Sequence, residues 1–278
     1  MWNRWIKTGI VSSLLGMVVY AGAAWADHSW STYHWARTAN PITLMVVDSV
    51  SGEWQFEFDT ALTEWNVSSV LDMGVADPPD DSSRTRKQCR MVSGQIRICN
   101  AAYGFNGWLG LATIGLDSNG HIDRGTAKVN DSYASYWADP NEKRHVMCQE
   151  IGHLFGLGHT SENGSSQQTC MDYSMDPYSI SPNAHDYELL GSMYFHPDSY
   201  NSYDGGASGA DSGGCTAPPG KGCNKNRADV GLGPDGSPPM GVRVHRGRFK
   251  EIWVAPRPDG GLWIHHIRLV PEEFRDVR

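Results

Sequence analysis

Residues 149–159 read Gln-Glu-Ile-Gly-His-Leu-Phe-Gly-Leu-Gly-His, and this stretch decides how the rest of the sequence is interpreted. On a helix, Gln149 and His153 lie one turn apart on the same face, with Cβ atoms roughly 5–6 Å apart. Gly156 then lets the chain reverse, so that His159 returns to the same point. The spacing predicts three side chains converging on one metal ion.

Glu150 follows the first of these residues and is turned around the helix, away from the ligand face. From there its carboxylate can hold a water molecule rather than the metal. Zinc lowers the pKa of bound water towards ~7, and a nearby carboxylate can take the proton as the resulting hydroxide attacks a peptide carbonyl. The stretch therefore predicts a catalytic Zn²⁺ site for peptide hydrolysis, with Glu150 as the general base.

The stretch resembles the metzincin zinc motif His-Glu-x-x-His-x-x-Gly-x-x-His at every defined position except the first, which is Gln149 here. Twelve residues after His159, Met171 lies in a Cys-Met-Asp-Tyr segment that resembles the Met-turn of the same clan. The resemblance implies that His153 and His159 are zinc ligands, and that Met171 forms a hydrophobic floor beneath the metal.

Tyr173 stands two residues after Met171, where astacin-like members place a tyrosine that ligates zinc or stabilises the tetrahedral intermediate. The resemblance also implies an α+β, metzincin-like fold. It would be a twisted, mostly parallel sheet of about five strands, with an active-site helix and a C-terminal helix. The substrate would be a protein or peptide, bound in a cleft between two subdomains.

Gln149 departs from the motif, because an amide oxygen is a poorer zinc ligand than an imidazole nitrogen. Gln149 could ligate weakly, Tyr173 or a second water could complete the site, or the site could be inactive. His145 is two helical turns from His153, ~12 Å along the axis, so the two cannot share an ion on a continuous helix. The prediction is a zinc endopeptidase, and the alternative is a catalytically inactive extracellular binding domain of the same fold.

Residues 1–26 have the pattern of a secretory signal peptide: basic residues, an apolar run, and an Ala-Trp-Ala end. No later segment is apolar enough to span a membrane, so a secreted protein without a membrane anchor is expected. The chain carries a formal charge of −8, and this acidity argues against nucleic acid as a partner. Oligomeric state is left open.

All six cysteines lie after the predicted signal peptide, and an even number favours disulfides over free thiols in an exported protein. Six cysteines allow fifteen pairings. Nearest-neighbour pairing is preferred, and it joins Cys89 with Cys99, Cys148 with Cys170, and Cys215 with Cys223.

Periodicity and turn residues divide the chain into a signal peptide (1–26), a metalloprotease-like catalytic domain (27–200), a Gly/Ser/Pro-rich linker (201–239) and a small C-terminal β-hairpin element (240–278). The active-site helix is expected from Asp139 to about Phe155, capped by Asp139 with Glu142 closing a capping box. Further helices are expected at 53–65 and 185–194. Strands are expected at 42–50, 69–75, 95–100, 108–114 and 127–130, and two more within 248–270.

Two weaker patterns complete the analysis. Residues 107–112 precede the active-site helix as the cleft-edge strand does in metzincins, where substrate backbone pairs with the edge, although a plain buried strand explains them nearly as well. Asp117, Asn119 and Asp123 could supply oxygen ligands for Ca²⁺, although a tight turn is the preferred interpretation.

Overall fold

The computed structural model describes residue 29 and residues 33–203, 232–233 and 236–275. Its centre is a twisted sheet of eight strands in the order β2-β1-β3-β5-β4-β8-β7-β6. The strands are β1 (Ile42–Ser49), β2 (Leu71–Val75), β3 (Gln95–Ala101), β4 (Trp108–Leu116), β5 (Ile122–Asn130), β6 (Val242–Arg246), β7 (Lys250–Pro256) and β8 (Leu262–Leu269). The predicted signal peptide lies outside the described residues, as does most of the predicted linker.

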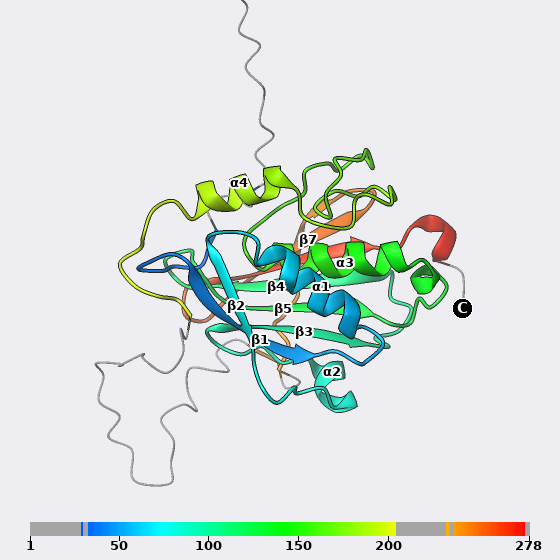
Figure 1. Ribbon diagram of the computed structural model, residues 1–278. Helices are drawn as coiled ribbons and strands as arrows, with labels where there is room; N and C mark the ends of the chain where they lie inside the picture. The colour runs from blue at the N-terminus through cyan, green and yellow to red at the C-terminus, as the bar shows by residue number, and fades with distance from the viewer. Residues whose placement is uncertain (1–28, 30–32, 204–231, 234–235, 276–278) are drawn as a thin grey trace, which may run out of the picture.

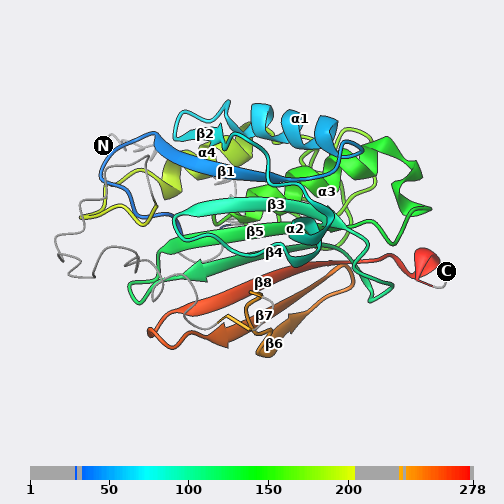
Figure 2. The ribbon, with the colours of Figure 1, turned by 90° about the horizontal axis from the view of Figure 1, so that it is seen from below.

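Strands β2, β1, β3 and β5 run parallel, whereas β4 is antiparallel to β5. This part of the sheet matches the α+β arrangement expected from the sequence. The prediction of about five mostly parallel strands is wrong in extent. The chain adds β8, β7 and β6 to the free edge of β4, all antiparallel to their neighbours, and the sheet therefore has eight strands (Figure 2).

The helices α1 (Gln55–Trp65), α3 (Pro140–His153) and α4 (Ala184–Met193) lie on one face of the sheet, and the short α2 (Ser83–Gln88) lies on the other (Figures 1 and 2). The described residues also include the 3₁₀ helices Tyr136–Ala138, which leads directly into α3, and Glu272–Phe274. Each end of α1, α3 and α4 lies within two residues of the end predicted from the sequence.

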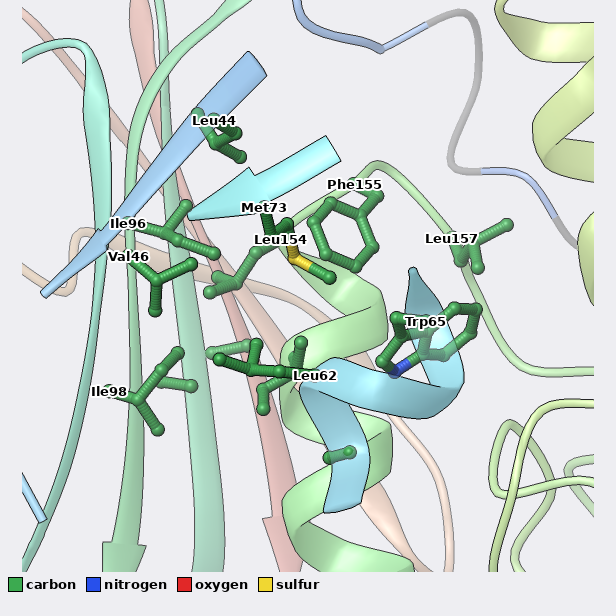
Figure 3. Packing of buried hydrophobic residues seen from close by; sticks show 14 of the residues in the cluster. Leu44, Val46, Leu62, Trp65, Met73, Ile96, Ile98, Leu154, Phe155 and Leu157 are labelled. Atoms are coloured by element: carbon green, nitrogen blue, oxygen red, sulfur yellow. The ribbon is translucent and has the colours of Figure 1, made fainter. Parts of the chain in front are cut away.

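The main core fills the space between α1, α3 and the sheet. Buried side chains from β1 and β3 meet Leu62 and Trp65 of α1 and Leu154 and Phe155 beyond α3 (Figure 3). Apolar residues recur on one stripe of α1, so that Phe58, Leu62 and Trp65 all face inward. This packing fixes α3 against β4 and β5, and with it the residues that α3 carries.

Asp139 caps α3 as expected: its side chain accepts a hydrogen bond from the Asn141 amide (2.9 Å), and Pro140 occupies the first turn. The predicted capping box does not form. The Glu142 carboxylate instead accepts a hydrogen bond from the Tyr136 hydroxyl and pairs with Arg268 of β8 (3.5 Å). A long-range partner has displaced the local one.

Two of the predicted disulfides are present, Cys89–Cys99 and Cys148–Cys170, each with its Cα atoms 5.9 Å apart. Cys215 and Cys223 lie outside the described residues. Within the described part of the chain, no helix is both long and apolar enough to cross a membrane.

Candidate active site

His153 and His159 approach each other after the chain reverses at Gly156. Gly156 has φ +94°, and a Cβ atom there would lie 2.0 Å from the Tyr33 carbonyl oxygen, so only glycine fits this turn. The two imidazole rings lie 4.5 Å apart, centroid to centroid, at 77°. The structure thus brings together two of the three side chains that the sequence predicted to bind zinc.

Both rings are held through Nδ1. His153 Nδ1 lies 2.8 Å from the Leu157 carbonyl oxygen, and His159 Nδ1 lies 3.4 Å from the Tyr173 hydroxyl. Because Nδ1 of His159 is engaged, its Nε2 is the ring nitrogen that can bind a metal, which is a common arrangement for zinc-binding histidines. His159 Nε2 has no hydrogen-bond partner among the described residues, and burial lowers the pKa of His159 well below its usual value. A buried neutral imidazole is the form that binds metal.

Glu150 projects from α3 against β4. A Cβ atom on Gly110 would lie 2.2 Å from Glu150 Oε1, so the absence of a side chain on this strand creates the space for the carboxylate. Neither carboxylate oxygen has a hydrogen-bond partner of normal geometry in the described part of the chain. Burial raises the pKa of Glu150 to about 8, and Arg268 and the Ala112 backbone lower it only in part. Burying the Glu150 carboxylate without a hydrogen-bond partner costs free energy, and a bound cation or water would offset this cost.

Gln149, the third predicted ligand, is engaged elsewhere. Its amide nitrogen donates to the carbonyl oxygens of Cys170 (2.9 Å) and Asp172 (2.7 Å). Its amide oxygen accepts from Arg268 Nη1 (2.8 Å). The atom that would have to bind zinc is therefore already hydrogen-bonded to a cation, and this arrangement argues against Gln149 as a ligand.

Arg268 is the residue of β8 that sequence reasoning missed. It is buried, and its guanidinium contacts His145 Nε2 (3.1 Å) and Glu142 as well as Gln149. His145 also lies 2.9 Å from the Asp172 carbonyl oxygen, so it is a buried hydrogen-bonding residue and not a surface one. Because the Arg268 guanidinium contacts several buried groups of α3, and Gln149 and His145 in turn contact the Met-turn loop, Arg268 helps to hold α3, β8 and this loop together.

His266 is the second residue of β8 that sequence reasoning missed. In the sheet it pairs with Ala112 of β4, and Arg268 pairs with Gly110, so both side chains lie on the face that α3 covers. The His266 ring stacks on His153 (4.4 Å, 15°) and lies 6.5 Å from the His159 ring. Sequence showed only a strand in a C-terminal hairpin. No local pattern could reveal that this strand docks beside the motif.

The imidazole rings of His153, His159 and His266 lie close together, but their nitrogen atoms do not converge on one position. Among the described residues, His153, His159 and His266 do not form a group whose ligand nitrogens all lie within 4.8 Å of one another. Rotation of the stacked rings about their side-chain bonds would be required to bring all three nitrogens onto one ion. The His153 and His159 rings are neighbours and the His266 ring stacks on His153, but among the described residues the three do not form an assembled ligand set.

Met171 lies beneath α3. A Cβ atom on Gly152 would lie 2.6 Å from the Met171 sulfur, and the Thr160 amide donates to the Met171 carbonyl oxygen (2.9 Å). The adjacent Cys148–Cys170 bridge ties the helix to the same loop. Tyr173 is buried, with its ring 4.3 Å from that of His159. Met171 and Tyr173 thus lie beside the residues of the helix motif, and the roles that the resemblance implies for them stay predictions.

The edge of β4 is not open. The sequence offered residues 107–112 as an edge strand for substrate, but β8 pairs with β4 along its length, so this interpretation is wrong for the structure described. A pocket of about 340 Å³ lies next to the site. Its lining includes Tyr173 and Arg268, together with Tyr136, Arg248 and Phe249. The pocket thus touches the site through Tyr173 and Arg268, while Glu150, His153, His159 and His266 are not among the residues that line it.

The predicted calcium ligands take other partners. Asp117 accepts hydrogen bonds from the amides of Asn119 (2.8 Å) and His121 (3.0 Å), which is the tight turn that the sequence favoured. Asp123 binds Arg257 through two hydrogen bonds (2.8 and 3.1 Å). The two carboxylates are thus committed to different neighbours, and the structure gives calcium no support.

Among solved structures, the chain is similar to the crystal structure of archaemetzincin from Archaeoglobus fulgidus in complex with malonate. The match has 16% sequence identity and a TM-score of 0.29, and it covers 53% of this chain and 98% of that chain. No family model matches the sequence, and no curated protein matches it. Similarity at this level carries no argument about activity, and we therefore derive the function from the residues of the site.

Proposed function

We propose that this chain is an extracellular, zinc-dependent endopeptidase in which His153 and His159 bind the metal and Glu150 is the general base. One observation carries this proposal: among the described residues, both carboxylate oxygens of buried Glu150 and the Nε2 atom of buried His159 have no hydrogen-bond partner. Burying such groups without partners costs several kcal/mol, so their joint presence supports a bound ion and water. A zinc ion there would supply a Lewis acid that polarises a peptide carbonyl and acidifies water.

His266 is the third ligand in this proposal, in place of Gln149. Its ring already lies against that of His153, and an imidazole nitrogen is a better zinc ligand than an amide oxygen. Gln149 in turn positions the helix, because it bridges Arg268 and two carbonyl oxygens of the Met-turn loop. The departure from the sequence motif is compensated by a residue more than a hundred positions later in the chain.

Glu150 performs the proton transfer. Burial raises the pKa of Glu150 to about 8 in the protein alone, so the group is then mostly protonated at neutral pH; a cation bound nearby would lower this pKa and give the ionised carboxylate that a general base requires. Tyr173 holds the His159 ring through Nδ1 and lies at the wall of the 340 Å³ pocket. From there its hydroxyl can donate to the oxygen of a substrate carbonyl as negative charge develops.

Peptide substrate would enter through that pocket, since β8 occupies the edge of β4. The oxidising compartment implied by two disulfides agrees with action outside the cell. Protein or peptide is the substrate class because the carboxylate, the metal pair and the tyrosine together suit attack of water on an amide.

The test is Glu150→Gln, measured for hydrolysis of denatured casein and for bound zinc. We expect turnover to fall by a factor on the order of 10²–10⁴ with zinc content unchanged, because the base is lost and the ligands are kept. Glu188→Gln is the matched control, since Glu188 is an exposed carboxylate on α4, a helix that carries none of the proposed catalytic residues. Wild type that binds zinc but cleaves nothing would end the proposal.

A second variant pair tests the ligands. His266→Ala should lower zinc affinity at least tenfold, whereas Gln149→Ala should leave it within about threefold while lowering stability. If Gln149→Ala lowers zinc affinity more than His266→Ala does, the Gln149 amide oxygen is the ligand and His266 is not. Equilibrium dialysis with zinc, read beside circular dichroism, separates lost binding from lost folding.

A catalytically inactive binding domain is the second candidate, and one observation favours it. Strand β8 covers the β4 edge, and Arg268 holds the Gln149 oxygen, so the site is more enclosed than an open protease cleft. Such a domain would bind its partner equally well with Glu150→Gln. Loss of proteolysis in that variant, with wild type active, decides for the enzyme.

A further inference from the structure

We propose that this chain has a second metal site, separate from the candidate active site, in which His34, His121 and Asp198 bind a structural Zn²⁺. Each of the three offers one ligand atom, and these atoms all lie within 4.8 Å of one another. In the described part of the chain, no other group of three such side chains meets this spacing. His34 and Asp198 are buried at their side chains, and His121 is largely so.

The spacing between the atoms is that of metal ligands. His34 Nε2 lies 3.5 Å from Asp198 Oδ1, and His121 Nε2 lies 3.4 Å from the same oxygen. Ligands held 2.0–2.1 Å from a tetrahedral zinc ion lie about 3.3 Å from one another. Ordinary N–H···O hydrogen bonds are shorter, near 2.9 Å. The distances therefore match the edges of a zinc tetrahedron better than a set of direct hydrogen bonds.

Neighbouring residues hold the ligands in orientation. His121 Nδ1 lies 2.8 Å from the Tyr200 hydroxyl, which in turn bonds to Asp117, so Nε2 of His121 is turned towards Asp198. Asp198 Oδ2 accepts from the Arg37 amide (3.0 Å) and guanidinium (3.1 Å). Outer hydrogen bonds of this kind orient ligands around protein-bound zinc.

His196 supplies a fourth group at the surface. Its Nε2 lies 3.7 Å from Asp198 Oδ1, and its ring lies 5.1 Å from that of His34, with the side chain 58% exposed. Three imidazoles thus surround one carboxylate oxygen. N/O ligand sets of this type suit zinc.

The ion would join three segments that are distant in sequence. His34 precedes β1, His121 lies in the turn between β4 and β5, and Asp198 follows α4. The neighbouring Trp35 indole donates to the Leu154 carbonyl oxygen (2.8 Å), just beyond the end of α3. We infer a structural metal that fixes the N-terminal segment and the segment after α4 onto the sheet, next to the turn that carries the chain from α3 to His159.

The experiment compares zinc content and melting temperature for wild type, Asp198→Asn and His121→Gln after dialysis against micromolar zinc. Asp198→Asn keeps an acceptor oxygen for Arg37 and removes the charge, while His121→Gln changes a side chain in a turn. His245→Gln is the matched control, because His245 is exposed on β6 and far from the group. Circular dichroism confirms folding in each case.

We expect each of the two variants to bind one zinc equivalent fewer than wild type, and the control to bind the same number. Added zinc should raise the melting temperature of wild type more than that of either variant. Because the readout is a difference of one equivalent, it does not depend on whether the active site binds zinc. Equal zinc content in wild type and in a folded Asp198→Asn or His121→Gln variant would overturn the proposal.

Discussion

Arg268 is the residue on which the buried polar network depends. It is the cationic partner of Glu142 and donates to the Gln149 oxygen in a part of the molecule with almost no exposure to water. Removing one partner of a buried charge pair leaves the other unpaired. We expect Arg268→Met to lower the free energy of unfolding by about 3–5 kcal/mol, measured by urea denaturation.

Arg246→Met is the matched control for this prediction, because Arg246 is exposed at the sheet edge. A change within about 0.5 kcal/mol is expected there. If Arg268→Met costs no more than the control, the guanidinium network contributes little, and the position of β8 must be fixed by apolar packing alone.

Asp186 makes stability depend on pH. Burial raises the pKa of Asp186 from 3.8 to about 6, and hydrogen bonds from Thr169 and Asn183 lower it only in part. Between these two values the folded state binds more protons than the unfolded state, so this residue's contribution to stability falls as pH rises from about 4 to 6. Two pKa units correspond to roughly 3 kcal/mol.

Asp186→Asn removes this titration. We expect the stability of the variant relative to wild type to rise with pH by up to roughly 3 kcal/mol between pH 4 and pH 7, in urea titrations at each pH. A difference that stays constant over this range would show that the carboxyl group titrates at the same pH in both states.

At this scale the sequence predicted Glu150, His153 and His159 because their spacing on a helix and turn is local. It could not predict His266 or Arg268, since nothing in the local pattern of β8 indicates which strand it pairs with. It also assigned Glu142 to a capping box, and a buried arginine from β8 took that carboxylate instead.

The Cys148–Cys170 bridge connects two elements of the site, the helix α3 and the Met-turn loop. Replacing both cysteines by alanine should lower the free energy of unfolding by ~2–4 kcal/mol, because the bridge closes a loop of 22 residues in the unfolded chain. It should also weaken zinc binding, since the loop that carries Tyr173 is released. Calorimetry and zinc titration measure the two effects.

Replacing Cys89 and Cys99 is the control. That bridge closes a shorter loop of 10 residues away from the site, so it should cost stability without changing zinc affinity. Equal effects on zinc affinity from both pairs would mean that the Cys148–Cys170 bridge does not act through the site.

At the scale of elements, the helices and the first five strands followed from periodicity, capping residues and turns. The strands near the C-terminus were expected as a hairpin, and β7 and β8 form it around the turn at residues 257–261. The sequence left open whether this hairpin packs on the catalytic domain, and it did not indicate β4 as the partner strand. Pairing between strands distant in sequence is decided by the packing of whole surfaces, and periodicity alone carries no signal for it.

For the whole molecule, the sheet order predicts a gradient of local stability. Strand β4 lies between β5 and β8, while β6 is an edge strand with all its residues exposed. Amides of β4 should therefore exchange with deuterium at rates near those of global unfolding, and β6 amides much faster. Native-state hydrogen exchange with mass spectrometry measures both.

Fast exchange along β4, at denaturant-independent rates, would contradict this order. It would mean that β8 separates from β4 by local opening, and that the edge facing the site becomes exposed without unfolding of the rest.

The pairing of β4 with β8 also limits when, during synthesis of the chain, the candidate site can form. Thr113 and His265, which bond across the two strands, are 152 positions apart. At a synthesis rate of about 5–20 residues per second, roughly eight to thirty seconds separate their appearance on the ribosome. The helix motif is complete at His159, and from then until His266 is made the nascent chain carries the motif without His266. If His266 is the third ligand, the proposed zinc site can form only after β8 has been synthesised.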